Sequence, residues 1–310
     1  MLLIINPSAG TGTALEKWSK IRPRVRELLG SFATLMAADP EIVKQQIVDR
    51  LRRGETSFVA AGGDGTVNLV MSTIVEHAAT EAVAAIKLGA IGLGSSNDFH
   101  KPLCSSRQIE GIPFKLNFGL TLQHDVCLLT YRDDAANLRT GRWFINASVG
   151  ITADASHFFN GQGPVLRFLK RFSPASGIGY AALRTILGHR ARPMTMTLDD
   201  KTTLRARVKN LGIAKNPHFT GALCYDSPHE PSSGRFYVHL LRDVSPLGLA
   251  LALLRLCRGR FGGQKGAESW PARRLIVQAD QPFLVEGDGE VVSAREACFS
   301  IMPRGLQVCT

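Results

Sequence analysis

The sequence predicts an N-terminal doubly wound α/β domain followed by a mainly β domain that carries helical insertions. Over the first third of the 310 residues, short continuous apolar runs alternate with helix-like stretches. This pattern is typical of a parallel sheet covered on both faces. From Leu122 onward, strand-like segments dominate instead. Because the chain is long enough for two hydrophobic cores, we expect domains at residues 1–121 and 122–299.

Each element of the first domain has its own local signal. We expect helices at residues 14–29 and 67–79 and between Pro40 and Gly54, and strands at residues 2–5, 32–37, 57–61 and 89–94. Pro23 is expected to bend or restart the first helix. Asp39 suits the N-cap of the second helix, Pro40 its first position and Gly54 its end.

The second domain is defined by six strand-like segments and two helical ones. The strands are expected at residues 125–131, 142–150, 194–200, 204–216, 235–243 and 273–279. Residues 165–187 and 246–258 interrupt this pattern and are predicted to be helical. Runs of strands with such interruptions indicate a β domain with helical insertions.

The composition is typical of a globular cytosolic protein. Apolar residues make up 45% of the chain and charged residues 20%, which differs from disordered and fibrous proteins. The six cysteines show no CxxC spacing, so neither a zinc knuckle nor a disulfide framework is indicated. The first residues lack the basic flank of a signal peptide, and residues 246–257 fall short of the about 20 residues that span a bilayer.

A glycine-rich loop indicates a phosphate-binding site. Gly62, Gly63 and Gly65 surround Asp64 at the expected carboxyl end of the third strand, where parallel α/β sheets bind their ligands. Bare backbone amides and the N-terminus of the next helix favour an anion, and Thr66 is expected to cap that helix or to donate to a phosphate. A carboxylate at such a place implies Mg²⁺ between it and the phosphates, so Asp64 is the expected metal ligand.

Two further loops favour this interpretation over the alternative, a tight turn with a capping aspartate. NPSAGTG at residues 6–12 follows the first strand, and GLGSSNDF at residues 92–99 follows the fourth. Three small-residue loops at one edge of a sheet form a floor of nucleotide size. The residues expected to bind the nucleotide are Asn6, Gly10, Gly62, Gly63, Asp64, Gly65, Thr66, Asn68, Gly94, Ser95 and Asn97.

These loops resemble the diacylglycerol kinase catalytic-domain superfamily, which includes bacterial lipid kinases, sphingosine kinases and ceramide kinases. Three later segments carry the same resemblance: FINASVGITAD at residues 144–154, AKNPHFTGALCYDSPHEPSSGRFYV at 214–238 and EGDGE at 286–290. The resemblance implies a nucleotide-binding domain like that of NAD kinases and phosphofructokinases, a C-terminal β-sandwich, and ATP with Mg²⁺ as cofactors. It also implies that residues 300–310 return to the first domain.

The resemblance assigns two carboxylates to catalysis. Asp64 is expected to act on the phosphates through Mg²⁺ and water, and Glu290 to take the proton of the attacking hydroxyl group. Because a free glutamate has a pKa of about 4.3, burial or a nearby carboxylate has to raise it for this role. Glu286 and Asp288 are close enough in sequence to act as such neighbours. The alternative for Glu290 is a place in an ordinary acidic β-turn.

Asp98 and Asp125 resemble further carboxylates of the family, which link the nucleotide site to the domain junction. The alternatives are a helix N-cap for Asp98 and a strand end for Asp125. One departure from the family concerns a second metal. Bacterial members hold a structural Mg²⁺ with an aspartate before a glycine, where this chain has Ser233 before Gly234. Because a hard cation prefers anionic oxygen ligands, the sequence puts that second site in question.

The positive charge indicates an anionic partner. The net charge is +11, from 37 Lys and Arg against 26 Asp and Glu. Residues 155–198 and 244–267 contain no acidic residue, and Arg167, Lys170 and Arg171 lie beside an apolar helical face in the first of these stretches. We expect these three residues to face an anionic membrane; the alternative is that the helices pack on the β domain and their charges are solvated. Nucleic acid is not expected, since aromatic residues do not interleave with the basic ones.

Together these features predict an ATP- and Mg²⁺-dependent lipid kinase, cytoplasmic and peripheral at the inner face of a membrane. Its acceptor is expected to be the hydroxyl group of a diacylglycerol-like or related lipid, which the sequence does not specify further. The alternatives are an enzyme like NAD kinase and a non-catalytic protein that binds lipid or nucleotide.

Overall fold

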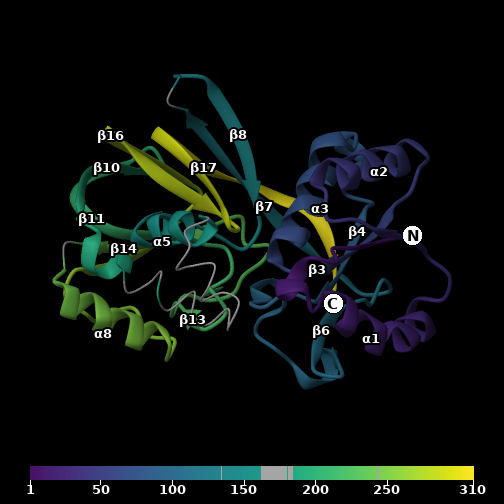
Figure 1. Cartoon of the computed structure of the whole chain (residues 1–310). Helices are drawn as coiled ribbons and strands as arrows, with labels where there is room; N and C mark the ends of the chain where they lie inside the picture. The colour runs from purple at the N-terminus through teal and green to yellow at the C-terminus, as the bar shows by residue number, and fades with distance from the viewer. Residues whose placement is uncertain (134, 162–179, 181–183, 243) are drawn as a thin grey trace.

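The chain forms two lobes in the computed structural model, and strands of one continuous sheet pass between them (Figure 1). The structure describes residues 1–133, 135–161, 180, 184–242 and 244–310. Within these ranges, every helix is too short or too polar to cross a bilayer.

The first lobe is a parallel sheet with helices on both faces. Its strands lie in the order β4-β3-β1-β2. The elements are β1 (Leu2–Ile5), β2 (Ala33–Met36), β3 (Ser57–Gly62), β4 (Lys87–Gly92), η1 (Ala9–Gly12), α1 (Ala14–Leu29), α2 (Pro40–Arg52), α3 (Asp64–His77) and α4 (Thr80–Val83). Trp18, Ile21 and Val25 pack α1 on one face, whereas α2 and α3 cover the other. The doubly wound domain predicted from the sequence is confirmed.

Local sequence rules account for most element ends in this lobe. Asp39 accepts the N–H of Glu41 at 2.9 Å and caps α2, with Pro40 at its first position, as predicted. The predicted restart of the helix at Pro23 is wrong, because α1 runs unbroken through this residue. The predicted bend there stays a prediction. Pro23 is exposed, so water can hydrate the carbonyl group that loses its donor. α3 begins at Asp64, earlier than predicted, since the glycine loop itself forms its first turn.

The second lobe consists mainly of antiparallel strands around its own core. The order is β15-β14-β11-β10-β16-β17, with β9 against β11 and β16, and β8 against β7. The strands are β7 (Thr121–Arg132), β8 (Leu138–Trp143), β9 (Asn146–Gly150), β10 (Arg192–Leu198), β11 (Thr202–Ala214), β14 (Phe236–Arg242), β15 (Ala267–Ala272), β16 (Arg274–Gly287) and β17 (Glu290–Cys309). Trp143, Phe236, Phe283 and Phe299 are the largest side chains of its core. This lobe confirms the predicted β domain.

Helices and short elements complete the second lobe and the junction. They are α5 (Ile151–Asn160), α8 (Pro246–Leu256), η2 (Asp98–His100), η3 (Ser105–Arg107), β5 (Gln108–Ile109), β6 (Ile112–Lys115), β12 (His218–Phe219) and β13 (Leu223–Cys224). α8 confirms the predicted helix at residues 246–258. The helix predicted at residues 165–187 lies largely outside the described residues. α5 was not predicted, because its ten residues follow a strand without a capping side chain.

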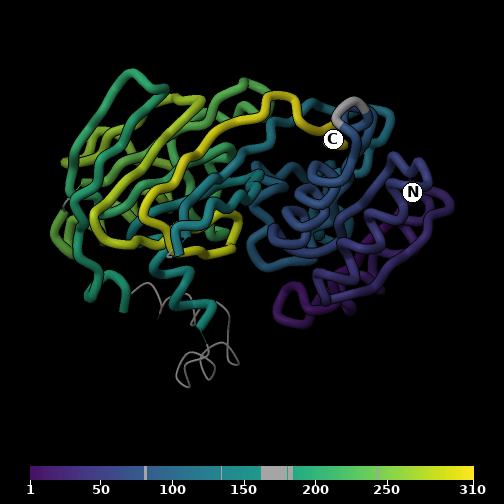
Figure 2. Tube along the Cα trace, turned by 90° about the horizontal axis from the view of Figure 1, so that it is seen from above, coloured from purple at the N-terminus to yellow at the C-terminus, as the bar shows by residue number. Residues whose placement is uncertain are grey.

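One long strand joins the lobes. β17 pairs with β16 in the second lobe, with β7 along much of its length, and finally with β4 in the first lobe. In this last part Gln307 and Val308 lie parallel to Lys87 and Leu88. Figure 2 shows the yellow C-terminal segment crossing from one lobe to the other. The end of the chain therefore adds a strand to the first sheet, while the exact limits of the two domains stay predictions.

A buried ion pair at this junction joins β7 to the residue that directly follows β11. Asp125 is fully buried, and one of its carboxylate oxygens lies 2.5 Å from the ammonium group of Lys215. The main-chain N–H groups of Gly234 and Arg304 each donate to Asp125 at 2.8 Å. Because a buried carboxylate is costly unless its oxygens are paired and hydrogen-bonded, these three donors are what make its place tolerable.

Candidate functional site

The loops after β1, β3 and β4 meet at the carboxyl edge of the parallel sheet. The side chain of Asn6 donates to the hydroxyl group of Thr66 at 3.2 Å. Gly63 and Gly94 touch so closely that a Cβ on Gly94 would lie 2.5 Å from the Cα of Gly63. A Cβ on Gly62 would lie 2.3 Å from the hydroxyl oxygen of Thr66. The glycines are therefore needed so that bare main chain from two loops can form one surface.

The loop after β4 is closed by its own asparagine. Asn97 adopts a left-handed conformation with φ 50°. Its side chain accepts the N–H of Gly94 at 3.1 Å and donates to the carbonyl oxygen of Gly94 at 3.2 Å. Gly10 lies against the same loop, since a Cβ there would be 2.6 Å from the carbonyl oxygen of Leu93. The structure thus brings the predicted residues of three loops together, and Ser95 is exposed beside them.

Sequence reasoning missed one cation at this site. Lys17, on the first turns of α1, donates to the carbonyl oxygens of Leu93 and Gly94 at 3.3 and 3.2 Å. An ammonium group beside a glycine-rich loop can neutralise phosphate charge. The sequence signal was a lysine soon after the loop that follows β1. It was missed because surface lysines on a helix are common and only the fold brings this one to the loop after β4.

Asp64 orders the turn that follows β4. Its two carboxylate oxygens accept the main-chain N–H groups of Asp98 at 3.0 Å and Phe99 at 2.9 Å. Burial, followed by the nearby carboxylate of Asp98, raises the pKa of Asp64 to about 6. Asp98 is buried too, lies 2.8 Å from the ammonium group of Lys101, and accepts the N–H of Gly221. The carboxylates of Asp64 and Asp98 in the first lobe therefore lie close to the main chain of Gly221 in the second lobe.

These residues fit a metal that arrives with a nucleotide better than a cage made of protein alone. Among the described residues, no group of three or more His, Cys, Asp and Glu side chains is placed to hold a metal ion. Mg²⁺ usually keeps several waters and takes only one or two carboxylates together with phosphate oxygens. Asp64 and Asp98 supply two carboxylates of that kind, and Asp98 is also paired with the ammonium group of Lys101.

The residues at the second metal site questioned above are engaged with other protein groups. Asp125 meets the ammonium group of Lys215 rather than another acidic residue. The hydroxyl group of Ser233 donates to carbonyl oxygens of Glu230 and Arg235. The positive charge beside Asp125 thus comes from the ammonium group of Lys215.

The acidic turn between β16 and β17 carries three carboxylates that differ in burial: Glu286 and Asp288 are buried, and Glu290 is exposed. Asp288 is buried, and its oxygens accept the main-chain N–H groups of residues 144, 145 and 146 at 2.6, 3.1 and 3.0 Å. The side chain of Asn68 on α3 donates to Asp288 at 2.7 Å and to the carbonyl oxygen of Arg142 at 3.1 Å. Asn68, predicted to bind nucleotide, therefore has its amide group directed to the junction of the lobes.

Glu286 and Glu290 lie in opposite environments. Glu286 is 4% exposed and accepts from the hydroxyl group of Ser148 at 2.8 Å and the N–H of Gly289 at 2.7 Å. Burial raises the pKa of Glu286 to about 7 and that of Asp288 to about 6. Glu290, the predicted base, is exposed. The burial expected for Glu290 thus falls on its two acidic neighbours, because the turn directs their side chains inward.

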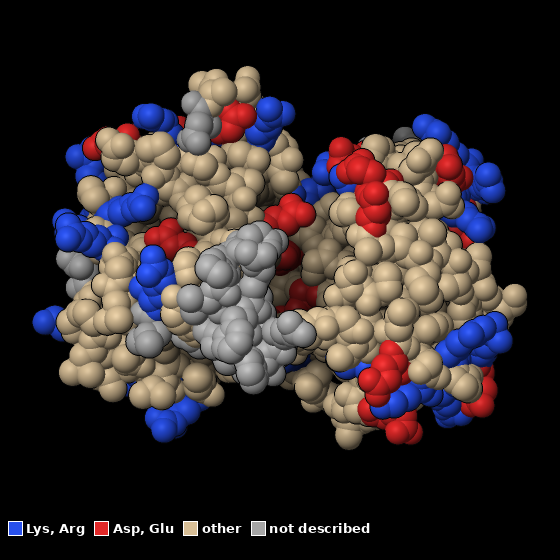
Figure 3. All heavy atoms as spheres, in the orientation of Figure 1, with Lys and Arg blue, Asp and Glu red and all other residues tan. Residues whose placement is uncertain are grey.

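An apolar cavity of about 370 Å³ opens next to this turn. Its lining includes Ser96 of the loop after β4 and Gly289 of the acidic turn. Its walls are mainly aliphatic and aromatic side chains of α5, α8 and the strands beneath them. Figure 3 shows acidic side chains inside the cleft between the lobes, with Lys and Arg mostly on the outer surfaces. The predicted membrane-facing residues Arg167, Lys170 and Arg171 lie outside the described residues.

Two family models cover most of the chain. Residues 1–128 match the diacylglycerol kinase catalytic domain, and residues 149–310 match the YegS C-terminal NAD kinase β-sandwich-like domain. The fold and the resemblance stated from the sequence agree with both.

Individual relatives are more distant. The chain is 30% identical over 125 residues to a candidate lipid kinase of Streptococcus pneumoniae, which covers 40% of this chain and 41% of that protein. It is 29% identical over 136 residues to an uncharacterised protein of Synechocystis, covering 41% and 30%. The matched region thus spans well under half the length of these curated relatives. Two Bacillus anthracis structures, described as a diacylglycerol kinase and a candidate one, superpose with TM-scores of 0.65 and 0.72 at 13% and 14% identity, covering 99% of this chain and 95% and 96% of theirs.

The buried carboxyl group of Glu286 predicts a pH-dependent gain of stability in Glu286→Gln. Because the folded pKa is raised above the unfolded value of 4.5 to about 7, the folded state holds the proton more tightly. The contribution of Glu286 to stability is full below pH 4.5 and falls as the pH rises through 7. The variant cannot ionise, so its stability relative to the wild type should rise by up to about 3 kcal/mol between these pH values.

Urea unfolding at a series of pH values measures this difference. Glu290→Gln, on the same turn but exposed, is the matched control and should show no such trend. A constant difference between Glu286→Gln and the wild type would contradict the raised pKa.

Proposed function

Because the chain belongs to the family that joins a diacylglycerol kinase catalytic domain to a YegS-type β-sandwich domain, we propose that it is an ATP-dependent lipid kinase. In this proposal it transfers the γ-phosphate of ATP to a hydroxyl group of a long-chain lipid. Family membership supports a kinase that uses ATP; the lipid acceptor and Mg²⁺ are our inference from the site.

The observation that carries the proposal is that the apolar cavity is lined by residues of the same loop and turn that carry the proposed phosphate-binding and catalytic groups. Ser96 belongs to the loop that carries Gly94, and Gly289 belongs to the turn that carries Glu290. A hydrocarbon chain in the cavity gains about 0.8 kcal/mol for each buried CH₂ group. A lipid held in this way would present its polar end beside Ser96 and Gly289, next to the glycine loops.

The residues of the cleft then divide the work of phosphoryl transfer. The glycine loops present main-chain N–H groups to the phosphates, and Lys17 adds a positive charge. Asp64 and Asp98 would hold Mg²⁺, which supplies neutralisation of phosphate charge when bound. Glu290, at the exposed end of the acidic turn, is the group that can accept the proton of the lipid hydroxyl and pass it to solvent.

The outer side of α8 supports an approach to a membrane. Leu247, Leu251 and Leu254 are 72%, 53% and 55% exposed, although the opposite side of the helix already packs on the cavity. Arg255 and Arg258 follow in a stretch without acidic residues. Apolar side chains next to basic ones suit the surface of an anionic bilayer, which we propose as the occupant of this face.

A protein that binds nucleotide or lipid without turnover is the second candidate. One observation favours it: both carboxylate oxygens of Asp64 already accept main-chain N–H groups. Each oxygen retains a further lone pair, so this engagement alone does not prevent contact with a metal. Turnover decides between the two candidates.

A panel of acceptors with radiolabelled ATP tests the proposal. We expect label transfer to at least one of diacylglycerol, a sphingoid base and ceramide, and none to NAD. Asp64→Asn should lower turnover at least about a hundredfold, because it removes the negative charge that would hold Mg²⁺, the ion that would neutralise the phosphate charge. Asp49→Asn, a partly exposed change on α2, is the control. Transfer to NAD alone, no transfer at all, or full turnover of a folded Asp64→Asn variant would refute the proposal.

Filling the apolar cavity should penalise long acceptors selectively. Ala155 on α5 lines the cavity, so Ala155→Phe takes up space that an acyl chain would use. We expect KM for a long-chain acceptor to rise by about tenfold or more, since several CH₂ groups lose their place. KM for ATP, and for an acceptor with short chains, should stay within about twofold. An equal effect on both acceptors would show that the chain lies elsewhere.

The membrane face is tested by vesicle sedimentation. Leu247→Ser with Leu251→Ser should weaken binding to phosphatidylglycerol-containing vesicles by at least about tenfold, because each buried leucine contributes about 1.5–3 kcal/mol. Leu28→Ser with Leu138→Ser, two exposed leucines on other surfaces, should leave binding unchanged. Equal binding of both double variants would exclude α8 as the contact.

A further inference from the structure

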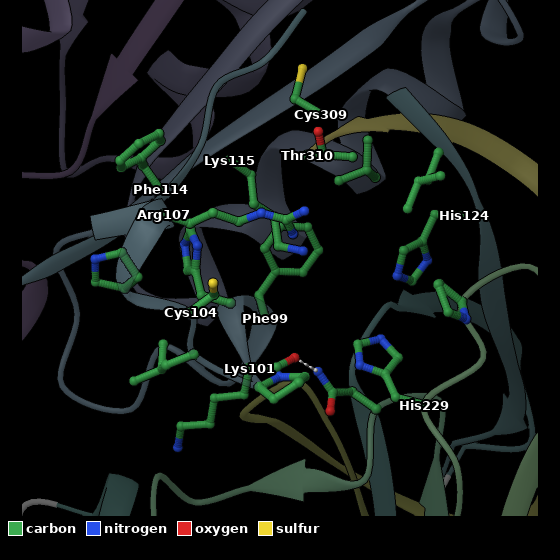
Figure 4. A pocket seen from close by; sticks show the side chains of 18 of the residues that line it. Phe99, Lys101, Cys104, Arg107, Phe114, Lys115, His124, His229, Cys309 and Thr310 are labelled. Carbon is green, nitrogen blue, oxygen red and sulfur yellow. Dashed lines mark hydrogen bonds between the residues drawn. The ribbon is translucent and has the colours of Figure 1, made fainter. Parts of the chain in front are cut away.

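A second cavity lies behind η2, away from the glycine loops. Its volume is about 290 Å³, and its walls come from residues 99–107, from β6, from the start of β7, from residues 216–231 and from the end of β17 (Figure 4). None of the predicted nucleotide-binding residues lines it. The proposed lipid kinase function does not use this cavity.

The walls of this cavity carry positive charge without any acidic side chain. Lys101, Arg107 and Lys115 contribute to the lining, and neither Asp nor Glu does. Three histidines also line the cavity but are neutral at pH 7, because burial lowers the pKa of each to about 3 or 4. Lys101 is already paired with Asp98. Within the described ranges, Arg107 and Lys115 have no carboxylate within 4 Å. Figure 4 shows the side chain of Arg107 lying across the cavity in front of Phe99, close to Lys115.

Lys115 is held in an environment that disfavours its charge. Burial, followed by the positive charge of Arg107, lowers the pKa of Lys115 to about 8. The ammonium nitrogen lies 5.3 Å from the centroid of the Phe99 ring, a contact that offsets only part of the cost. Two neighbouring cations, of which Lys115 is half-buried, leave room for an anion that would pair with both.

His100 adds an unused hydrogen-bonding group to the same wall. It is 7% exposed, and neither of its ring nitrogens has a hydrogen-bond partner in the part of the chain that the structure describes. Buried polar groups are almost always paired, and an unpaired one costs about 1–3 kcal/mol. A ligand that enters the cavity can supply the missing partner.

The remaining lining is aromatic and aliphatic. Phe99, Phe114 and Phe144 face the cavity together with prolines and leucines. Bare inorganic anions would leave these surfaces unused, whereas an organic body attached to the anion would bury them. We propose that this cavity binds an organic anion: a phosphate or carboxylate group that pairs with Arg107 and Lys115, carried on an apolar body. The same chemistry occurs in lipid headgroups with part of their chains and in soluble aryl or alkyl phosphates.

Isothermal titration calorimetry on the whole chain at pH 7 tests the site with three probes: inorganic phosphate, phenyl phosphate and a short-chain phosphatidic acid below its micelle concentration. We expect phenyl phosphate, phosphatidic acid or both to bind at least about tenfold more tightly than inorganic phosphate. Binding of both indicates a soluble ligand as well as a lipid, and binding of phosphatidic acid alone indicates a lipid; either result supports the proposal. Equal affinity for inorganic phosphate would overturn it.

The double variant Arg107→Gln with Lys115→Met tests whether the probe binds in this cavity. The double variant should bind the preferred probe at least about tenfold more weakly. Lys20→Gln with Lys44→Gln, which removes the same charge from exposed surface pairs, should bind as the wild type does. Because Lys115 is half-buried without an acidic partner, its replacement by methionine should not lower the melting temperature. Unchanged affinity in a folded double variant would place the probe outside this cavity and overturn the proposal.

Discussion

The pairing of β7 with β17 is the constraint on which the rest of the molecule depends. These strands run from one lobe into the other, and the end of β17 also pairs with β4. The carboxyl edge of the first sheet is therefore held against the second lobe at a fixed distance. Each polar contact of the cleft, from Asp98 with Gly221 to Asn68 with Asp288, relies on that distance. Loss of register between the two strands would separate all of them at once.

Buried carboxylates gather at this junction, and each is satisfied in its own way. Asp125 meets an ammonium group, Asp288 meets main-chain N–H groups and an amide, and Asp64 meets the N–H groups of η2. Such networks are stable only when every member is paired. Glu290 is left as the exposed acidic group of its turn. One accessible carboxylate suits the proposed proton transfer better than three competing ones would.

Local chemistry made the first lobe and its loops predictable, whereas contacts between distant residues stayed hidden. Glycines that adjoin apolar runs indicated where main chain had to be bare, and Asp39 with Pro40 indicated a helix start. No local pattern shows that Asn68 meets a residue 220 positions away, or that Lys17 reaches the loop after β4. The burial of Glu286 rather than Glu290 depends on the direction in which a turn faces. Sequence spacing cannot supply that direction, because it follows from the register of β16 and β17.

The turn η2 is shared by two surfaces of opposite character. On one side, the N–H groups of Asp98 and Phe99 position the carboxylate of Asp64 at the glycine loops. On the other side, Phe99 and His100 form part of the wall of the basic cavity. The proposed anion would therefore contact the same turn whose main-chain atoms position Asp64, so η2 would lie between the two proposed sites.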